Sequence, residues 1–431
     1  MVDALAILPF DGPIDAVVTP PGSKSITNRA LLAAALAPGK STLRGVLFAE
    51  DTEAMIDCIG DLGATVERTD EPTTLCVTGV GGSLSVDSLR FFARQSGTTA
   101  RFLASALALG HVPLTLDADD AMRQRPMNDA FLALQHLGVK VSFQDSEGCL
   151  PAIIEGPVQV VGETPTITID ASVSSQFTSG LLLAAPCMPE GLRIEISGEV
   201  VSRPYLDMTV EVMASFGSVV DQPDERTFIV APGGYVATDF AIEPDASAAS
   251  YFFAAAAICG GTVRIEGLGT DSMQGDVHFV DVLADMGAIV SVDRNSITVT
   301  GAPLHGVTSD FSQISDTAQT AAAVAVFADG PTTITGIGFI RKKETDRVAA
   351  VVTELRRMGV DATEDADGFT VSPGSTSPTT VETYDDHRMA MSMALIGFAR
   401  SGISIADPNC VRKTFPTYFT EMERLRPGGN K

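Results

Sequence analysis

One pattern of about seventy residues recurs six times along the chain and constrains its fold more than any other feature. Each copy has an alanine-rich helical segment, a glycine turn and a strand with alternating apolar residues, as in NRALLAAALAPGKSTLRG from residue 28. The turn glycines of the six copies are Gly39, Gly110, Gly191, Gly261, Gly330 and Gly402. A regular period of this length indicates a fold built from repeated structural units.

A second pattern recurs with the same period, in which an amphipathic helical segment ends at a glycine that precedes a short strand. LGATV from residue 62 and MGAIV from residue 286 are two of its five copies. The glycines of this pattern are Gly63, Gly138, Gly217, Gly287 and Gly359. Glycine ends helices at this place because it adopts the left-handed conformation without steric cost. Two helices and several strands in each repeat predict an α/β fold.

The six repeats divide into two groups of three. Residues 231–240, with the sequence APGGYVATDF, contain a proline followed by two glycines and indicate a loop between the groups. We predict a first lobe of residues 22–237 with three repeats. Residues 1–21 and 238–431 then form the second lobe, so that the chain crosses between the lobes twice.

The composition restricts the class of protein. Hydrophobic residues make up 45% of the chain and charged residues 19%, which is typical of globular proteins. The net charge of −25 disfavours a surface for nucleic acid or anionic membranes, because both bind basic faces. Interrupted apolar stretches and an N-terminus without the layout of a secretory signal predict a cytoplasmic protein. The six cysteines include no C-x-x-C pair and suggest neither a disulfide framework nor a metal site.

Basic residues concentrate near the starts of the repeated helices, although acidic residues outnumber basic ones by 54 to 29. The basic residues at these places are Lys24, Arg29, Arg94, Arg101, Arg123, Arg125, Arg341, Lys342, Lys343, Arg347, Arg388, Arg412 and Lys413. A helix N-terminus already carries unpaired N–H groups and a partial positive charge, so added cations disfavour the helix. Phosphate and carboxylate groups bind well at such places. The pattern therefore predicts multiply anionic ligands.

Eight segments together resemble a known family. They are PGSKSITNRALL from residue 21, SGTTARFL from 96, RQRPM from 123, SVSSQFTSGLLLAAP from 172, VSRPYLDMT from 201, RKKETDRVAAVVTELRRMG from 341, DDHRMAMSMAL from 385 and DPNCVRKTFPTYF from 407. From about residue 20 to 420 they resemble the 3-phosphoshikimate 1-carboxyvinyltransferases, or EPSP synthases. The resemblance implies two lobes of three βαβαββ repeats each, the inside-out α/β barrel of the enolpyruvyl transferase fold, with the active site in the cleft between the lobes.

The resemblance also implies the reaction. The 5-hydroxyl of shikimate 3-phosphate would add to the central carbon of phosphoenolpyruvate, and inorganic phosphate would then leave. This transfer belongs to the shikimate pathway to chorismate and aromatic amino acids. Neither a metal nor an organic cofactor is expected, and the two substrates are the expected partners of a monomer. Glyphosate, a known inhibitor of the family, would occupy the phosphoenolpyruvate site.

Residues of these segments match the family's site for phosphoenolpyruvate. By resemblance this set is Lys24, Gly97, Arg125, Gln176, Arg347, Arg388 and Lys413. Cations suit the phosphate and carboxylate of the substrate. Gly97 leaves its backbone open for close approach of a ligand, and a larger residue there would intrude on the pocket.

A second set of residues matches the family's site for shikimate 3-phosphate. By resemblance this set is Ser25, Arg29, Ser174, Ser175, Gln176, Ser202, Tyr205, Asp316 and Lys343. Hydroxyl and amide groups suit the hydroxyls of the substrate ring, and the basic members suit its phosphate. We also expect shikimate 3-phosphate to draw the lobes together, because cations on both sides of a cleft repel until an anion bridges them.

The chemistry requires one group to take the proton of the attacking hydroxyl and another to exchange a proton with the methylene carbon. Asp316 and Glu344 match the family's acid and base carboxylates, and Lys24 could share proton transfer with Asp316. The alternatives are a helix N-cap for Asp316 and a surface ion pair for Glu344. His387 is expected to orient its neighbours rather than to catalyse.

Three residues depart from the family's usual pattern. Gln95 stands where the family commonly has Asn, Phe102 where one branch has Pro, and Phe339 where an Asn often contacts shikimate 3-phosphate. These departures leave the branch of the family and the sensitivity to glyphosate open.

Two other functions compete with this one. A UDP-N-acetylglucosamine enolpyruvyl transferase would share the fold, but it typically has a catalytic cysteine before the Arg-Pro pair, and residues 118–125 contain none. A non-catalytic repeat protein that binds anions would not require Asp316 or Glu344. Release of phosphate from phosphoenolpyruvate, measured with and without shikimate 3-phosphate, separates all three.

Overall fold

The computed structural model describes residues 4–84, 86, 88–159, 162–172, 174–198 and 200–426. The chain forms two compact units. Unit 1 comprises Met1–Pro21 and Glu243–Lys431, and unit 2 comprises Gly22–Ile242. The chain passes from unit 2 into unit 1 after Ile242, whereas the sequence placed this boundary after residue 237, because residues 239–241 still pair with a strand of unit 2.

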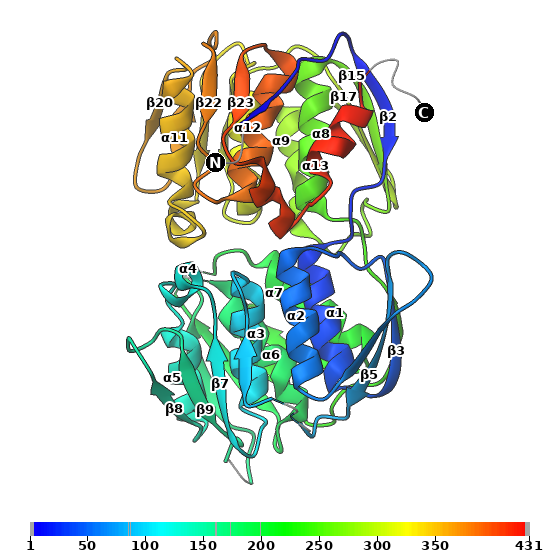
Figure 1. Cartoon of the computed structure of the whole chain (residues 1–431), viewed down its shortest axis with the longest axis vertical. Helices are drawn as coiled ribbons and strands as arrows, with labels where there is room; N and C mark the ends of the chain where they lie inside the picture. The colour runs from blue at the N-terminus through cyan, green and yellow to red at the C-terminus, as the bar shows by residue number, and fades with distance from the viewer. Residues whose placement is uncertain are drawn as a thin grey trace. The chain divides into compact units, whose positions relative to one another are not determined.

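Unit 2 contains three copies of the repeat, each with a four-stranded sheet whose strands follow the orders β14-β3-β5-β4, β6-β7-β9-β8 and β10-β11-β13-β12. In Figure 1, β7, β9 and β8 of the second sheet lie side by side. The elements are α1 Lys24–Leu36, β3 Pro38–Arg44, α2 Glu50–Asp61, β4 Thr65–Arg68, β5 Thr74–Val80, β6 Arg90–Phe92, α3 Gly97–Leu107, β7 Pro113–Asp117, α4 Asp120–Arg123, α5 Asn128–His136, β8 Lys140–Phe143, β9 Ala152–Glu155, β10 Thr166–Asp170, α6 Ser175–Ala184, η1 Ala185–Cys187, β11 Leu192–Ser197, α7 Pro204–Ser215, β12 Val220–Asp224, β13 Thr227–Val230 and β14 Asp239–Ala241.

Unit 1 contains the other three copies, with sheets of order β16-β17-β15-β2, β18-β19-β21-β20 and β1-β23-β22. The elements are β1 Leu5–Ala6, β2 Ile14–Val18, α8 Ala246–Cys259, β15 Gly261–Glu266, η2 Gly275–His278, α9 Phe279–Asp285, β16 Ile289–Val292, β17 Ser296–Thr300, β18 Thr308–Asp310, η3 Ser315–Thr317, α10 Ala318–Ala325, β19 Thr332–Thr335, η4 Gly338–Lys342, α11 Arg347–Arg357, β20 Ala362–Glu364, β21 Phe369–Val371, β22 Thr379–Val381, α12 His387–Ala399, β23 Ile403–Ile405, η5 Pro408–Lys413 and α13 Tyr418–Arg424.

The two chain crossings have a structural counterpart in the sheets. β2 precedes the first repeat in sequence, yet it pairs in parallel with β15 of unit 1. β14 precedes the fourth repeat, yet it pairs in parallel with β3 of unit 2. Each of these strands therefore completes the sheet of the first repeat of its own unit, although it is adjacent in sequence to a repeat of the other unit. The sixth copy differs from βαβαββ, because its third strand is the N-terminal β1, which runs antiparallel to β23.

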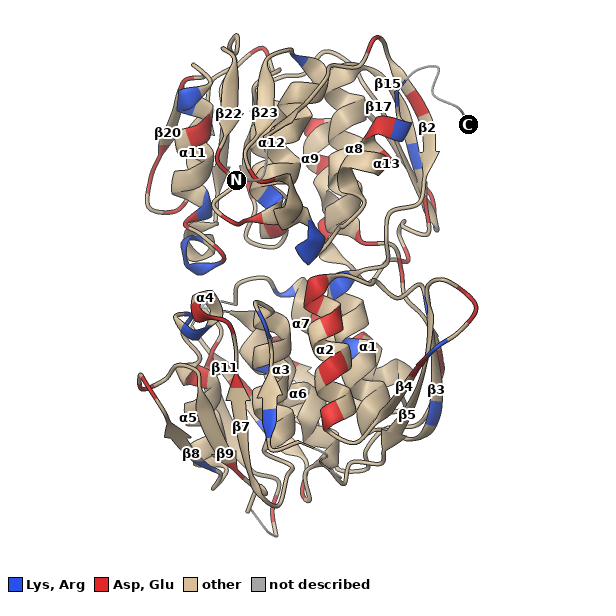
Figure 2. Cartoon of the chain, viewed as in Figure 1, with Lys and Arg blue, Asp and Glu red and all other residues tan. Residues whose placement is uncertain are grey.

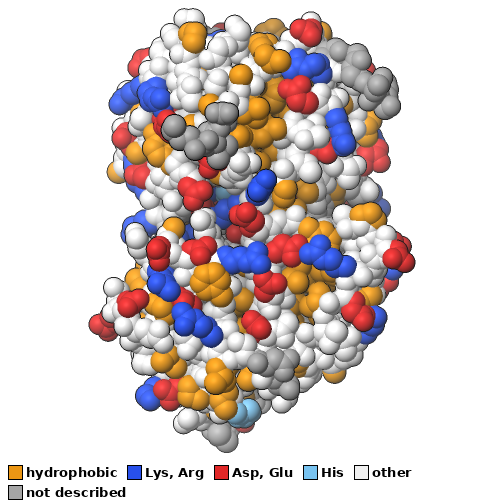
Figure 3. All heavy atoms as spheres, in the orientation of Figure 1, with side chains coloured by type: hydrophobic (Ala, Val, Ile, Leu, Met, Phe, Trp, Pro, Cys, Tyr) orange, Lys and Arg blue, Asp and Glu red, His pale blue; other side chains and the backbone are white. Residues whose placement is uncertain are grey.

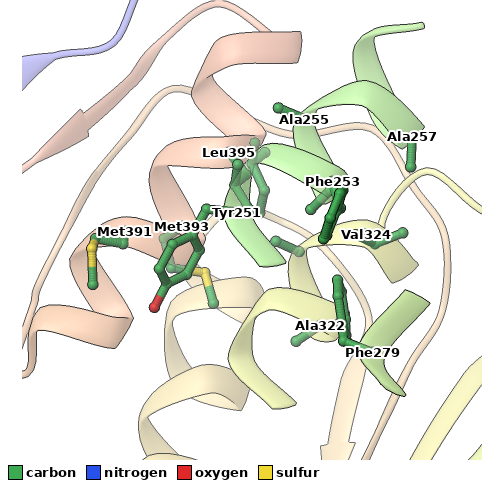
Figure 4. Close-up of a cluster of buried hydrophobic side chains, with 14 of the residues drawn as sticks. Tyr251, Phe253, Ala255, Ala257, Phe279, Ala322, Val324, Met391, Met393 and Leu395 are labelled. Atoms are coloured by element: carbon green, nitrogen blue, oxygen red, sulfur yellow. The ribbon is translucent and has the colours of Figure 1, made fainter. Parts of the chain in front are cut away.

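Each copy places one alanine-rich helix inside and one amphipathic helix outside. α8, α10 and α12 contact one another in unit 1, and their side chains form the cluster of Figure 4 together with Phe279 of α9. Small side chains let these helices approach closely and bury nearly all of their surface. One hydroxyl from each inner helix joins a buried chain, with Ser250 to Thr320 at 3.1 Å and Thr320 to Ser392 at 3.4 Å.

The glycines that end the outer helices behave as their pattern predicts. Gly63, Gly138, Gly217, Gly287 and Gly359 all have a positive φ, between 79° and 110°. A residue with a Cβ would be strained in this conformation, so the periodic glycines mark the helix ends directly. Among the described residues, no helix has both the length and the apolar character that a membrane crossing requires.

Candidate active site

The basic loops of unit 1 meet in one charged cluster at the N-terminal ends of the inner helices. Lys and Arg residues gather at one end of α11 and α12, close to acidic residues (Figure 2). Four cations, Lys343, Arg347, Arg388 and Lys413, contact three carboxylates, Asp316, Glu344 and Asp386. We call these seven residues the unit 1 cluster. On the face drawn in Figure 3, by contrast, acidic, basic and apolar side chains are interspersed.

Asp316 is the carboxylate with the most cation contacts in the unit 1 cluster. Its Oδ1 accepts hydrogen bonds from Lys343 Nζ at 2.6 Å and Arg347 Nη1 at 3.3 Å. Its Oδ2 accepts from Arg388 Nη2 at 2.6 Å, and its carbonyl oxygen accepts from Arg388 Nη1 at 3.1 Å. The N-cap position of α10 belongs to Thr317. The carboxylate of Asp316 therefore serves the cations rather than the helix end.

Glu344 joins two further cations. Arg347 Nη2 donates to its Oε2 at 2.9 Å, and Lys413 Nζ donates to its Oε1 at 3.0 Å. The side chain of Glu344 is 14% exposed, so this is not an ion pair of the open surface. Glu344 therefore links Arg347, at the start of α11, to Lys413, at the end of η5.

Arg347 and Asp386 form the buried base of the unit 1 cluster. Arg347 Nε and Nη2 donate to the two carboxylate oxygens of Asp386 at 2.7 and 3.3 Å, and both side chains are almost fully buried. Burial opposes the charge of Arg347, but Asp386, Glu344 and Asp316 together raise its pKa above the ordinary value. Asp386 also caps α12, since it accepts from the backbone N–H of Arg388 at 2.9 Å.

Two neighbouring groups have shifted proton affinities. Burial lowers the pKa of Lys343, although Asp316 opposes the shift. Burial, together with the charge of Asp316, raises the pKa of Asp276 to about 6, and the Ser247 hydroxyl donates to this carboxylate. Asp276 lies in MQGDVHF, which has no Lys or Arg and none of the family segments, so no sequence signal singled it out.

Unit 2 brings together a second set of expected residues around the start of α3. A Cβ built on Gly97 would lie 2.8 Å from Arg125 Nη1. Thr98 follows Gly97 and accepts a hydrogen bond from Gln176 Nε2 at 3.0 Å. Gln176 Oε1 accepts from Arg101 Nη1 at 2.5 Å. These contacts place Gln176 beside the helix start that carries Gly97.

Lys24 and the serines lie at other helix starts of unit 2. Lys24 Nζ is 3.4 Å from Asp51 Oδ2, a buried carboxylate at the start of α2 that lies outside the family segments. Ser174 is the N-cap of α6 and accepts from the Gln176 N–H at 3.2 Å. The remaining expected residues are Ser25 in the first turn of α1, Ser175 at the start of α6, Ser202 before α7 and Tyr205 in its first turn. Helices α1, α6 and α7 contact one another.

Arg29 is enclosed by protein groups. Its guanidinium donates to Thr209 Oγ1, Ser25 O, Ser179 Oγ and Tyr205 O at 2.8 to 3.3 Å. The residue is 1% exposed, and burial lowers its pKa to about 10. These contacts hold α1, α6 and α7 together, so the structure gives Arg29 a structural role, and its contact with shikimate 3-phosphate stays a prediction.

Two of the three residues that depart from the family pattern, Phe102 and Phe339, have rings beside basic groups. Phe102 is buried, and its ring centroid lies 5.2 Å from the Arg29 guanidinium carbon. The Phe339 ring centroid lies 5.7 Å from Lys343 Nζ, at the edge of the unit 1 cluster. His387 is buried next to Asp386, with Nδ1 3.7 Å from its carboxylate.

Comparison with known proteins identifies the family. Residues 10–422 match the family model described as EPSP synthase (3-phosphoshikimate 1-carboxyvinyltransferase). A 3-phosphoshikimate 1-carboxyvinyltransferase from Trichormus variabilis is 43% identical over 426 residues, which cover 98% of this chain and 99% of that protein. One from Aliivibrio salmonicida is 40% identical over 429 residues, which cover 98% of this chain and 100% of that protein.

Solved structures agree with the sequence match. An EPSP synthase from Acinetobacter baumannii superposes with a TM-score of 0.85 at 25% identity, covering 99% of this chain and 98% of that one. The enolpyruvyl transferase NikO from Streptomyces tendae has a TM-score of 0.75 at 17% identity, covering 99% of this chain and 98% of that one, which shows the fold alone. These likenesses confirm the expected α/β enolpyruvyl transferase fold and the resemblance drawn from the motifs. The chain belongs to the EPSP synthase (3-phosphoshikimate 1-carboxyvinyltransferase) family.

Proposed function

We propose that the unit 1 cluster and the helix starts of unit 2 bind phosphoenolpyruvate and shikimate 3-phosphate together and catalyse enolpyruvyl transfer between them. Membership of its family makes the chain an enolpyruvyl transferase of the shikimate pathway. The observation that carries the assignment of residues is the contact of Asp316 and Glu344 with four cations. A non-catalytic anion-binding protein would have no use for carboxylates among the cations that bind its ligand.

Phosphoenolpyruvate supplies a phosphate and a carboxylate for the cations. Its proposed ligands are Lys24, Gly97, Arg125, Gln176, Arg347, Arg388 and Lys413. Asp386 holds Arg347 through two hydrogen bonds and leaves the guanidinium oriented before the substrate arrives. Such preorganisation reduces the entropy lost on binding.

Shikimate 3-phosphate supplies hydroxyls and a second phosphate. Its proposed ligands are Ser25, Arg29, Ser174, Ser175, Gln176, Ser202, Tyr205, Asp316 and Lys343. The serines and Tyr205 lie at or just before helix starts, where backbone N–H groups favour an anion. Lys343, a proposed ligand of the phosphate, donates a hydrogen bond from Nζ to Asp316 Oδ1. It would thereby lie next to the carboxylate that faces the reacting hydroxyl.

The charges suggest how the two carboxylates act. Anionic substrates compete with Asp316 and Glu344 for the same cations, which reduces the stabilisation of the carboxylate charge and favours uptake of a proton. In the addition step, Asp316, with Lys24, accepts the proton of the 5-hydroxyl as its oxygen bonds to the central carbon of phosphoenolpyruvate, and Glu344 protonates the methylene carbon. In the elimination step, the bond from that carbon to the phosphate oxygen breaks, Glu344 takes its proton back, and the leaving phosphate takes up the hydroxyl proton held by Asp316 and Lys24.

A phosphate-release assay on the purified chain tests this function. Phosphate should appear when phosphoenolpyruvate and shikimate 3-phosphate are both present, and not with UDP-N-acetylglucosamine as the acceptor. Asp316→Asn and Glu344→Gln should each lower kcat by about 10²- to 10⁴-fold, the usual contribution of a general acid or base. The exposed Asp329, which pairs with His305, provides a control in Asp329→Asn, for which kcat should not change. Full activity of both active-site variants would refute the assigned roles.

We infer a monomer in the cytoplasm, on the basis of the sequence features and of the family resemblance. Sedimentation of the purified chain at several concentrations tests the monomer, since an increase in sedimentation coefficient with concentration would contradict it.

A further inference from the structure

Glu354, in the third turn of α11, is a fully buried carboxylate that the proposed mechanism does not use. Its Oε2 accepts hydrogen bonds from Arg357 Nη1 at 2.6 Å and from the backbone N–H of Glu382 at 3.0 Å. Its Oε1 accepts from the Tyr384 hydroxyl at 2.7 Å. A buried carboxylate is tolerated only with such partners, and two of these three belong to one loop.

That loop, residues 382–386, connects β22 to α12 and has an unusual backbone. Tyr384 and Asp385 both have a φ of 56°. Within the part of the chain that the structure describes, Arg94 and Ser202 are the other non-glycine residues with positive φ. Neither of them is adjacent to another non-glycine residue with positive φ. Two consecutive side-chain-bearing residues in this region cost conformational energy, so tertiary contacts must hold them. Glu354 contacts the loop on both sides of Thr383.

The Tyr384 hydroxyl is well suited to this contact. Burial and the hydrogen bond to Glu354 raise the pKa of Tyr384 to about 12. The hydroxyl therefore stays protonated at neutral pH and can donate to the carboxylate. The residue itself is 41% exposed, so its hydrogen bond, rather than core packing, fixes its place.

The end of the loop reaches the unit 1 cluster. Asp386 is fully buried, and its backbone N–H donates to Thr383 O at 2.9 Å. Its carboxylate receives Nε and Nη2 of Arg347 and the backbone N–H of Arg388. One short loop is thus fastened to α11 at two places, by Glu354 near its start and by Arg347 at its end, and it leads directly into the helix that carries Arg388.

We propose that Glu354 is a positioning residue for Arg347 and Arg388, two proposed ligands of phosphoenolpyruvate. Glu354 acts by holding residues 382–386 in place, so that Asp386 can orient both arginines. The inference rests on the proposed role of these two arginines in binding. Glu354 touches neither substrate in this scheme. Its removal should therefore weaken phosphoenolpyruvate binding far more than it slows the chemical step.

Two substitutions at Glu354 separate geometry from charge. In the wild type, Arg357 and the Glu382 N–H both donate to Oε2, so in Glu354→Gln the single amide oxygen can accept from both. The amide nitrogen of Gln can donate to the Tyr384 hydroxyl, which can accept as well as donate. This variant should keep KM for phosphoenolpyruvate within about twofold of the wild type. Glu354→Ala loses all three contacts and should raise KM about tenfold or more with kcat changed less than about threefold, as expected for a lost hydrogen-bond network.

Two further variants locate the effect in the loop. Tyr384→Phe removes one hydroxyl and leaves Glu354 its other partners, so KM should rise by about threefold, and the same change should have no effect in the Glu354→Ala background. Glu382→Ala is the matched control, because it removes an exposed carboxylate from the same loop. It keeps the backbone N–H of residue 382, which donates a hydrogen bond to Glu354. Its KM should equal that of the wild type.

Hydrogen exchange supplies a readout that does not depend on turnover. Amides of residues 382–388 should exchange faster in Glu354→Ala than in the wild type or in Glu354→Gln. Faster exchange with an unchanged KM, or a lower melting temperature alone, would overturn the proposal in favour of a purely structural role. Equal loss in the Gln and Ala variants would overturn it as well, since charge and not geometry would then matter. Failure of the proposed function would instead appear in the wild type, as an absence of phosphate release.

Discussion

The carboxylates of the unit 1 cluster are buried or nearly so, and each is paired with at least one cation. Asp316 accepts hydrogen bonds from three cations, Glu344 from two, and Asp386 is fully buried against Arg347. Removal of one member of such a network leaves its partners buried and unpaired, which costs more than the lost contact alone. Substitutions that keep the shape of a side chain are therefore the informative ones.

Gly97→Ala should weaken phosphoenolpyruvate binding. The added Cβ would lie 2.8 Å from Arg125 Nη1, so the guanidinium must move away. Gly97 has no positive φ, so alanine is compatible with its backbone, and the expected outcome is a raised KM at near-normal stability. Steady-state kinetics with varied phosphoenolpyruvate measures the effect. Gly12→Ala, where the new Cβ meets no atom within 4 Å, is the control, and an unchanged KM for Gly97→Ala would exclude a role of Arg125 at this position.

Asp276 should make stability depend on pH in an unusual direction. Burial and Asp316 raise its folded pKa to about 6 from 3.8, although Arg388 and Ser247 oppose the shift. A raised folded pKa contributes stability that is fully present below pH 3.8 and is lost as pH rises through 6. Asp276→Asn removes this dependence, so it should gain stability relative to the wild type between pH 4 and pH 7. Urea unfolding at both pH values measures the difference, and a constant difference would contradict the shift.

The helices and loops place these residues with little freedom. The inner helices are built from small residues, and their N-termini carry the charged side chains. In unit 2, α3 and α6 approach so closely that a Cβ on Gly180 would lie 2.7 Å from the carbonyl oxygen of Arg101. Because Arg101 also donates to Gln176, the packing of two helices and the position of a candidate ligand are linked.

Gly180→Ala should disturb both the helix pair and the site. Its backbone neighbours cannot rotate away, so α6 must shift, and overpacking of this kind typically costs about 1–3 kcal/mol. We expect a lower melting temperature and a raised KM for phosphoenolpyruvate. Gly60→Ala, in the outer helix α2 with no atom near the new Cβ, should instead be neutral or stabilising. If the Gly180 variant melted like the wild type, the close contact of α3 and α6 would be wrong.

At the scale of the whole molecule, two units carry separate sets of cations, and the chain passes between them twice. We expect shikimate 3-phosphate to draw the units together, because an anion that binds cations of both removes their repulsion. Small-angle scattering should show a smaller radius of gyration with shikimate 3-phosphate. Inorganic phosphate at the same concentration is the control, and equal radii with and without the substrate would contradict the expectation.

Several features were accessible from the sequence because they depend on local chemistry. The glycines at the ends of the outer helices were predicted from their period, and the structure gives all five a positive φ. Lys343, Glu344, Arg347, Arg388 and Lys413 were named from their motifs, and they contact one another through shared carboxylates in unit 1. Their roles toward the substrates stay predictions.

Other features required the tertiary structure, because they depend on contacts between distant segments. The pairing of β2 with β15 and of β14 with β3 cannot be read from strands that look alike in every repeat. Arg29 lies near the start of a repeated helix, as the other basic residues do. Only its hydrogen bonds to α6 and α7 show that it holds helices together. Glu354 lies in a charged stretch that reads as a solvated helix face, and folding buries it against the loop of Tyr384. The sequence alone thus determined the repeat, the helix ends and the family, while long-range packing decided which strands share a sheet and which charges meet.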